Sequence, residues 1–342
     1  MARAECRGAA LAGVRMSEVT YRQAINAALD AELAADPDVF LLGEDIGAGG
    51  GVFKATDGLF AKYGGERVFD TPISEQAIAG CALGAAMQGL RPVAEIMFSD
   101  FTAVCFDQIA NQIAKYRYMT DGQVSVPLTI RMASGAGGGF AAQHSQSAEQ
   151  WLLNVPGLKI VVPSTPSDAY WMLRAAIRDP DPVLYFEHKS LYGRKGEIAP
   201  LAATPTLGTA AVVREGADVT IVASQLMLLY ALEAAKQLAA DNISAEVLDP
   251  RVLRPVDVTL IRSSVARTGR LLMVQEAPLL GSWSASVIAL LAANSAAPWR
   301  EPPVLLAGAD TPVPYAAELE AAYLPSAERI AAAARQLVRP KP

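Results

Sequence analysis

The sequence predicts an α/β fold with two doubly wound, mostly parallel-sheet domains. Short apolar segments of buried-strand type alternate with amphipathic helical segments along most of the chain, which is typical of parallel sheets covered by helices. A length of 342 residues fits roughly two such domains. The periodicity is lost between Gly193 and Gly208, where prolines appear. We therefore expect an N-terminal extension at 1–16, a domain at 17–195, a linker at 196–208 and a domain at 209–342.

The first domain is predicted to begin with a helix at 20–35, because Thr20 and Gln23 fit a capping box and apolar residues then repeat at helical spacing. A buried strand at 39–42 ends at Glu44, and a helix begins at Glu75. The next elements are expected in the order strand 92–98, helix 102–118, strand 128–132, strand 158–162, helix 167–178 and strand 183–186. The second domain should contain strands at 219–223, 245–248, 270–274 and 304–306, and a helix at 228–240.

Composition restricts the kind of partner. The net charge is −6 and no basic stripe with interleaved aromatic residues occurs, so we expect no nucleic-acid partner. No apolar run reaches the roughly 18 residues that a membrane span requires, so no membrane association is expected. The cysteines Cys6, Cys81 and Cys105 form neither an even set nor a CxxC pair, which argues against a disulfide framework or a zinc site. These features favour a reducing compartment and a cytoplasmic location.

Candidate site residues follow several predicted strands at the edge where parallel sheets carry their active sites: Glu44, Phe101, the loop around His144, and Glu187. Neither glycine-rich loop matches G-x-G-x-x-G, because Val52 and Phe140 stand where the third glycine would fall. Judged alone, Glu75 could be a solvated acid at a helix start, and His144 an ordinary structural histidine. Phe101 could equally be a core residue.

Several longer stretches occur together in one order, and they are more specific than any short motif. They are Gly43-Glu44-Asp45, 68–75, 95–101, 106–109, 142–147, 163–166 and 187–189. With these stretches the chain resembles, over about residues 17–335, the β subunit of the thiamine-diphosphate-dependent first component of 2-oxo acid dehydrogenase complexes. This is a transketolase-like family, and the resemblance implies a pyrimidine-binding domain at 17–195 followed by a transketolase C-terminal-like domain.

The resemblance also implies roles for four residues. Glu75 matches the glutamate that hydrogen-bonds the pyrimidine ring nitrogen of thiamine diphosphate, and Phe101 matches the aromatic residue stacked on that ring. Glu44 is expected to support the same ring. His144 matches the histidine used around the covalent intermediate and the incoming lipoyl group, which suits a side chain that titrates near neutrality. Glu75 and His144 are therefore the predicted catalytic residues.

The resemblance further implies cofactors and partners. The chain lacks the Gly-Asp-Gly motif with a distal Asn that binds magnesium and diphosphate, so Mg²⁺ should be held by an α subunit in an α2β2 heterotetramer. That assembly would dock on a lipoyl-bearing acyltransferase core. Some relatives bind K⁺ through backbone carbonyls, and the matching positions here are Leu128, Ala176, Asp179 and Asp181; a plain helix end and turn is an equal alternative.

The implied activity is that of an oxidoreductase subunit that forms hydroxyethyl-thiamine diphosphate and acylates the lipoyl group. The stretches 101–108, 247–251 and 324–327 favour acetoin slightly over pyruvate as the substrate, and a branched-chain 2-oxo acid fits less well. Two other classes are alternatives: a non-catalytic scaffold paralogue, and a self-contained thiamine enzyme of the transketolase or deoxyxylulose-phosphate synthase type. Glu75 and His144 argue against the scaffold, and the missing diphosphate ligands argue against the self-contained enzyme.

Overall fold

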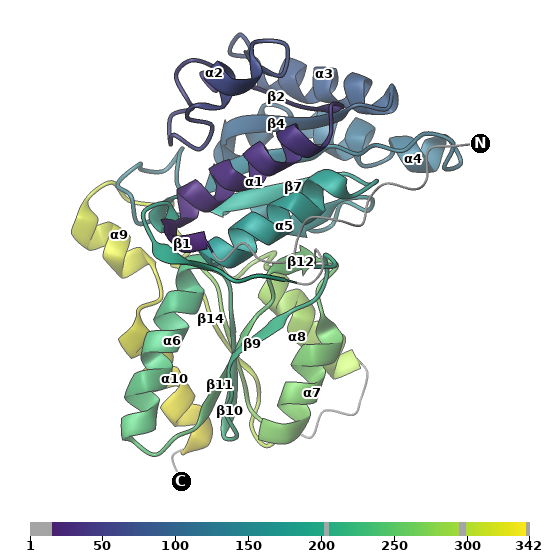
Figure 1. The fold of residues 1–342 in the computed structure, drawn as a ribbon. Coiled ribbons are helices and arrows are strands. Elements are labelled where there is room, and N and C mark those ends of the chain that lie inside the picture. Colours follow the sequence, from purple (N-terminus) through teal and green to yellow (C-terminus); the bar gives the residue numbers. More distant parts are fainter. Residues whose placement is uncertain (1–15, 202–204, 294–298, 340–342) are drawn as a thin grey trace.

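The computed structural model describes residues 16–201, 205–293 and 299–339, and within them it shows two α/β domains joined end to end (Figure 1). The first domain is built on a seven-stranded sheet in the order β12-β6-β7-β5-β4-β2-β3, in which only β12 is antiparallel to its neighbour. Its strands are β2 (Val39–Gly43), β3 (Val68–Asp70), β4 (Arg91–Phe98), β5 (Thr129–Ser134), β6 (Lys159–Val161), β7 (Val183–His188) and β12 (Val252–Arg254).

Helices cover both faces of this sheet. Along β7, Val183 and Tyr185 pack into one hydrophobic cluster, while Leu184 and Phe186 pack into the other, because successive strand residues point to opposite faces. The first cluster is closed by α1 (Tyr21–Ala35) and α5 (Pro166–Arg178), and the second by α3 (Glu75–Met87) and a π-helix (Gln108–Ile113). A short α2 (Leu59–Tyr63) lies between β2 and β3 in the chain.

The start of α1 confirms the predicted capping box. The Thr20 side chain accepts from the Gln23 N–H at 3.2 Å, and the Gln23 side chain accepts from the Thr20 N–H at 2.8 Å. The helix then runs to Ala35, as its apolar repeat predicts.

The prediction of a single helix at 102–118 is wrong. The chain instead forms a 3-10 helix (Ser99–Ala103), the π-helix (Gln108–Ile113) and a short α4 (Tyr116–Met119). The wider π-turn, closed by the bond from the Ala114 N–H to the Ile109 carbonyl, shifts the helical phase. Ile109 and Ile113 are buried as expected, but Tyr118 and Met119 beyond the turn are exposed.

The second domain contains a five-stranded sheet in the order β14-β13-β10-β11-β9, parallel except for β9. Its strands are β9 (Ala211–Arg214), β10 (Val219–Ala223), β11 (Ala245–Asp249), β13 (Leu271–Val274) and β14 (Val304–Leu306). Figure 1 shows α6 (Gln225–Ala240) and α10 (Ala327–Val338) on one face and α7 (Val258–Thr268) and α8 (Trp283–Ala293) on the other, with α9 (Ala317–Tyr323) near the first domain. The four predicted strands are confirmed, and the helix expected at 228–240 begins three residues earlier.

Five short strands were not expected from the sequence: β3, β9 and the three that follow. Strand β1 (Met16–Thr20) pairs antiparallel with β8 (Lys195–Ile198), so part of the segment read as a linker is ordered against the start of the first domain. Strand β12 belongs by sequence to the second half of the chain, yet it extends the sheet of the first domain beside β6. A strand from the second half of the chain therefore forms one edge of the first domain's sheet. Of the extension expected at 1–16, residues 1–15, with Cys6, lie outside the described residues, and Met16 begins β1.

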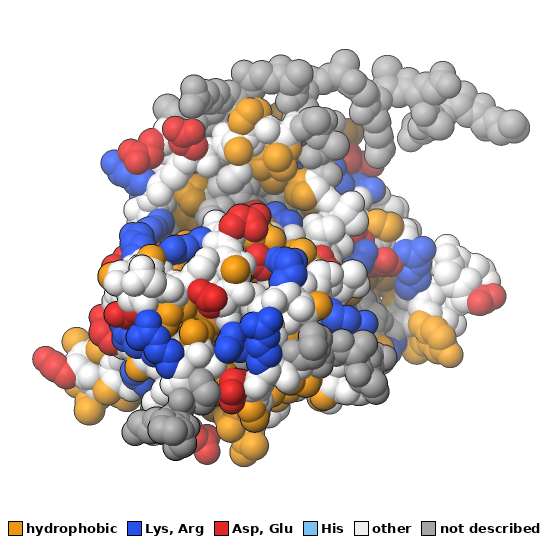
Figure 2. All heavy atoms as spheres, turned by 90° about the horizontal axis from the view of Figure 1, so that it is seen from below, with side chains coloured by type: hydrophobic (Ala, Val, Ile, Leu, Met, Phe, Trp, Pro, Cys, Tyr) orange, Lys and Arg blue, Asp and Glu red, His pale blue; other side chains and the backbone are white. Residues whose placement is uncertain are grey.

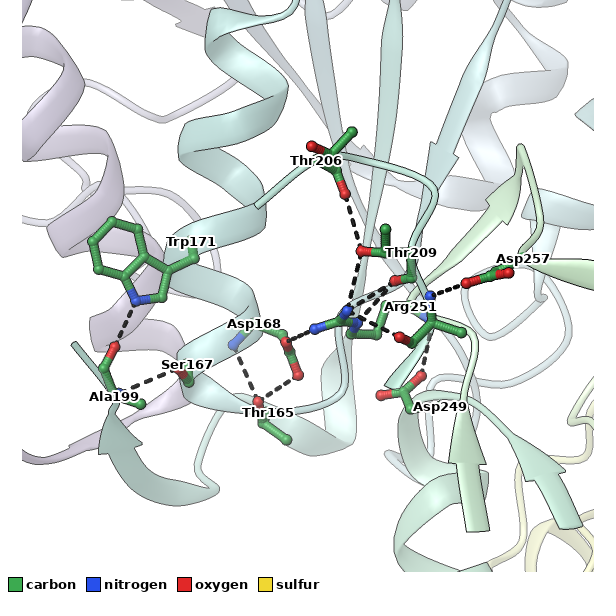
Figure 3. A network of polar contacts seen from close by, with 11 residues as sticks. Thr165, Ser167, Asp168, Trp171, Ala199, Thr206, Thr209, Asp249, Arg251 and Asp257 are labelled. Carbon is green, nitrogen blue, oxygen red and sulfur yellow. Dashed lines mark hydrogen bonds and ion pairs between the residues drawn. The ribbon is translucent and has the colours of Figure 1, made fainter. Parts of the chain in front are cut away.

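A polar network at Arg251 of the second domain joins Thr209, the first residue after the linker, to Asp168 of the first domain (Figure 3). The guanidinium donates to the Thr209 carbonyl at 2.9 and 3.1 Å and lies 3.4 Å from an Asp168 carboxylate oxygen at the start of α5. The Arg251 N–H donates to Asp249 at the end of β11 at 2.9 Å. Burial, foremost, and nearby Asp168 raise the pKa of Asp249 to about 7. Arg251 therefore connects β11, the segment just after the linker and α5.

In the described part of the chain, no helix is long and apolar enough to cross a bilayer. Figure 2 shows the end of the molecule opposite the first domain, where basic and acidic side chains are interspersed. No patch of a single charge dominates this face.

The Arg251 network generates a stability prediction. Arg251→Ala should lower the free energy of unfolding by about 1.5–3 kcal/mol, because backbone carbonyls lose a charged donor. Denaturant unfolding of the chain measures it, with Lys236→Ala as the control, since Lys236 is an exposed cation whose ion pair among the described residues is with Glu233. Equal stability of the two variants would show that the network does not stabilise the junction between the two domains.

Candidate active site

Glu44 and Glu75 form a pair of neighbouring carboxyl groups at the carboxyl edge of the first sheet. Glu44 directly follows β2, and Glu75 is the first residue of α3, which begins after β3. The two side chains are only 8% and 7% exposed. Parallel pairing of β2 with β3, continued by the bond from the Thr71 N–H to the Gly43 carbonyl at 2.9 Å, fixes the two segments side by side.

The environment favours the protonated form of Glu44. Burial, foremost, and then the charge of Glu75 raise the pKa of Glu44, and the backbone N–H of Ser74 opposes them only in part. One carboxylate oxygen of Glu44 is fully buried and has no hydrogen-bond partner within the described residues. Two buried carboxyl groups with an unsatisfied oxygen make a site suited to holding and exchanging a proton with a ligand.

His144 lies against an aromatic cluster at the same edge. Its ring centroid is 4.7 Å from that of Phe98 and 5.4 Å from that of Phe101, both edge-on. Phe98 is the last residue of β4, and Phe101 lies in the 3-10 helix that follows. The structure therefore brings the predicted residues together as two pairs, Glu44 with Glu75 and Phe101 with His144, on loops that follow adjacent parallel strands.

Glu187, also predicted at this edge, is engaged in a buried ion cluster. Arg131 on β5 donates to both of its carboxylate oxygens, at 2.7 and 2.9 Å, and to Glu95 on β4 at 2.7 Å. The Tyr192 hydroxyl completes the cluster at 2.8 Å from Glu187. Since Arg131 and Glu187 are 2% and 1% exposed, this cluster supports the sheet beneath the aromatic residues.

Lys189 was not singled out by the sequence analysis. Its ammonium is buried, has no hydrogen-bond partner within the described residues, and lies 5.6 Å from the ring centroid of Phe98 and 5.7 Å from that of Phe140. Burial lowers the pKa of Lys189 to about 8, although Asp100 and Glu276 act in the opposite direction. A cation thus lies under the aromatic cluster that His144 contacts.

The residues expected to hold K⁺ lie at the other end of the sheet. Leu128 immediately precedes β5, while Asp179 and Asp181 lie between α5 and β7, so all three are at the amino ends of parallel strands. Lys159 binds the Asp179 carboxylate at 2.6 Å and that of Asp181 at 3.3 Å. The carbonyl of Ala176 accepts the Asp179 N–H at 3.1 Å. Among the described residues, no group of three or more His, Cys, Asp or Glu side chains could hold a metal ion.

Family models match both halves of the chain. Residues 17–195 match the pyrimidine-binding domain of transketolase, and residues 208–330 match the transketolase C-terminal domain. The structure is similar to that of a split-gene transketolase in an inactive β4 tetramer, with a TM-score of 0.76, 28% identity and coverage of 94% of this chain and 98% of that one. The two-domain α/β fold is therefore the transketolase-like fold, as predicted.

Curated relatives are β subunits of dehydrogenase first components. The acetoin:2,6-dichlorophenolindophenol oxidoreductase subunit beta of Cupriavidus necator is 46% identical, with coverage of 94% of this chain and 98% of that protein. Pyruvate dehydrogenase E1 component subunit beta-2 of Oryza sativa subsp. japonica is 45% identical (93% and 86% covered), and the 2-oxoisovalerate dehydrogenase subunit beta of Bacillus subtilis is 44% identical (94% and 99%). The chain therefore belongs to the transketolase-like family and, within it, to the β subunits of the first component of 2-oxo acid and acetoin dehydrogenase complexes.

Proposed function

We propose that this chain contributes Glu75, Glu44, Phe101 and His144 to a thiamine diphosphate site that it shares with an α subunit. The observation that carries the proposal is the buried carboxyl pair, in which Glu44 keeps one unsatisfied oxygen beside Glu75. A buried carboxylate oxygen with no hydrogen-bond partner among the described residues calls for a polar ligand atom. Family membership makes thiamine diphosphate the ligand that fits.

The residues present suit the aminopyrimidine end of this cofactor. Glu75 would hydrogen-bond the pyrimidine ring nitrogen and hold the proton there, and Glu44 would support it from β2. Phe101, on the loop that follows β4, would provide an apolar face for the ring. When bound, thiamine diphosphate supplies a nucleophilic carbon and an electron sink for breaking the carbon–carbon bond next to a carbonyl.

His144 would move protons at the reacting oxygen of the substrate and at the lipoyl sulfur. An imidazole can donate and accept near neutral pH, which suits both tasks. Its edge-on contacts with Phe98 and Phe101 would help to position the ring for both transfers.

The diphosphate and Mg²⁺ would be held by the α subunit of an α2β2 assembly, because this sequence carries no Gly-Asp-Gly motif with a distal Asn. The acceptor would be a lipoyl group on an acyltransferase core. A K⁺ ion bound by carbonyls at Leu128, Ala176, Asp179 and Asp181 stays a prediction. Acetoin is proposed slightly ahead of pyruvate as the substrate, on the sequence stretches that resemble the acetoin branch. A branched-chain 2-oxo acid is the third candidate, since such a subunit is among the relatives.

Glu75→Gln should reduce turnover of the assembled enzyme at least about 10²-fold, because the amide cannot exchange the proton that activates the cofactor. Steady-state assays with an artificial electron acceptor measure the effect. Glu66→Gln is the matched control, since Glu66 is an exposed glutamate of the same domain. Near-normal turnover of the Glu75 variant would remove the proposed role.

His144→Ala should slow transfer to the lipoyl group more than it weakens binding of thiamine diphosphate, because the ring acts on the reacting groups. Reductive acylation of a lipoyl domain and calorimetric titration of the cofactor report the two effects separately. Gln143→Ala, an exposed neighbour in the same loop, is the control. A collapse of cofactor affinity with intact acyl transfer would contradict the assignment.

The substrate can be determined with reconstituted α and β chains. Acetoin should be turned over somewhat faster than pyruvate at matched concentration, with measurable cross-reactivity, because a methyl-sized difference in an apolar pocket is worth only about 1–3 kcal/mol. The β chain alone should be inactive if the site is shared. A clear preference for 3-methyl-2-oxobutanoate would instead place the chain in the branched-chain group.

A further inference from the structure

The loop that leads to His144 is bound by the C-terminal domain. This glycine loop, residues 135–139, follows β5 and carries three glycines with positive φ, at Gly135, Gly137 and Gly139. A side chain at Gly135 would lie 2.2 Å from Nε2 of His188, so the loop can follow this course only without one. The Gly135 N–H donates to the Gln146 carbonyl at 3.3 Å within the first domain, whereas the N–H groups of Ala136, Gly137 and Gly139 bond to the C-terminal domain.

Two buried glutamates of the C-terminal domain accept these N–H groups. Glu320 on α9 accepts the Gly137 N–H at 2.8 Å and the Gly139 N–H at 3.0 Å, and Glu276, just after β13, accepts the Ala136 N–H. Glu276 and Glu320 are 8% and 5% exposed. A buried carboxylate that accepts several backbone N–H groups makes strong, charge-assisted bonds.

Charge balance keeps Glu276 ionised in this position. Burial alone would raise the pKa of Glu276, but His188, the Ala136 N–H and Lys189 outweigh it and lower the pKa. His188 contributes through a contact of 2.7 Å between its Nε2 and a Glu276 oxygen. Lys189 also faces Glu320 and offsets its charge.

The segment just after His144 is fixed within the first domain through Gln146. Asp100 accepts from the Gln146 side chain at 2.8 Å and from the Gln146 N–H at 3.2 Å, and Ser99 donates to the Gln146 carbonyl at 3.1 Å. His144 lies between these bonds and the glycine loop. Its position therefore depends on anchors supplied by both domains.

We infer that Glu320 is a positioning residue for His144, which it controls from the C-terminal domain by binding the backbone of the glycine loop. The inference rests on the proposed role of His144. Glu276 shares the task, but it also contacts His188, whereas the hydrogen bonds of the Glu320 carboxylate within the described residues go to the glycine loop alone. Glu320 is therefore the residue through which the effect can be tested.

The first measurement follows the His144 ring directly. The chain contains two histidines, His144 and His188, so histidine-selective labelling gives two ring signals, assigned with His144→Asn. In Glu320→Ala the His144 signal should move toward that of free histidine, because the ring leaves Phe98 and Phe101. Glu318→Ala, an exposed glutamate on the same helix, should leave it in place. An unmoved signal in the Glu320 variant would overturn the inference, whatever happens to activity.

The second measurement is turnover of the enzyme reconstituted with its α subunit. Glu320→Ala should lower kcat by about 10²-fold with little change in KM, since a displacement of about 1 Å at a reacting group has an effect of this size. Glu320→Gln keeps one acceptor oxygen and should show a smaller loss, and Glu318→Ala none. If the His144 signal moves while kcat is unchanged, the positioning by Glu320 stands and the proposed role of His144 fails.

Discussion

Parallel pairing of β2, β4, β5 and β7 is the constraint on which the rest of the site depends. Parallel strands end at a common edge, so the loops after these four strands must emerge together although they are far apart in sequence. Glu44, Phe101 and His144 are all carried by such loops, and Glu75 follows β3 at the same edge. The same geometry sends Leu128, Asp179 and Asp181 to the opposite end of the sheet, where a bound cation could affect stability but not touch the reacting groups.

A buried ion cluster beneath this edge fixes the sheet that carries the loops. Arg131 bridges Glu187 and Glu95 with almost no exposure, so each charge depends on its partners. Removing one member of such a buried cluster typically costs about 3–5 kcal/mol, because the remaining charge is left uncompensated. The aromatic residues Phe53 and Phe98 pack edge-on above this layer, and His144 contacts Phe98 in turn. The Arg131 ion cluster therefore supports the aromatic residues that the His144 imidazole contacts.

The two domains contribute different kinds of groups to the proposed site. The first domain supplies every side chain that we place at the cofactor, while the second contributes carboxylates that bind backbone, at Glu276 and Glu320, and a strand, β12, that extends the first sheet. Arg251 binds Thr209, just after the linker, and contacts Asp168 of the first domain. A substitution in the C-terminal domain can therefore change the site without touching the ligand.

The fold class and most elements could be predicted from the sequence, because the alternation of apolar strands and amphipathic helices is a local property. The family could be predicted too, because the motifs around Glu75 and His144 are contiguous in the chain. The sequence did not determine the break in the helix predicted at 102–118, since the apolar spacing of Ile109 and Ile113 is the same in an α-helix and across a π-turn. Only the tertiary structure revealed β12 in the first sheet and Glu320 on the glycine loop. Both contacts join residues more than 90 positions apart. Glu320 binds backbone N–H groups, which nearly every residue type has, so the sequence does not indicate which of them it binds.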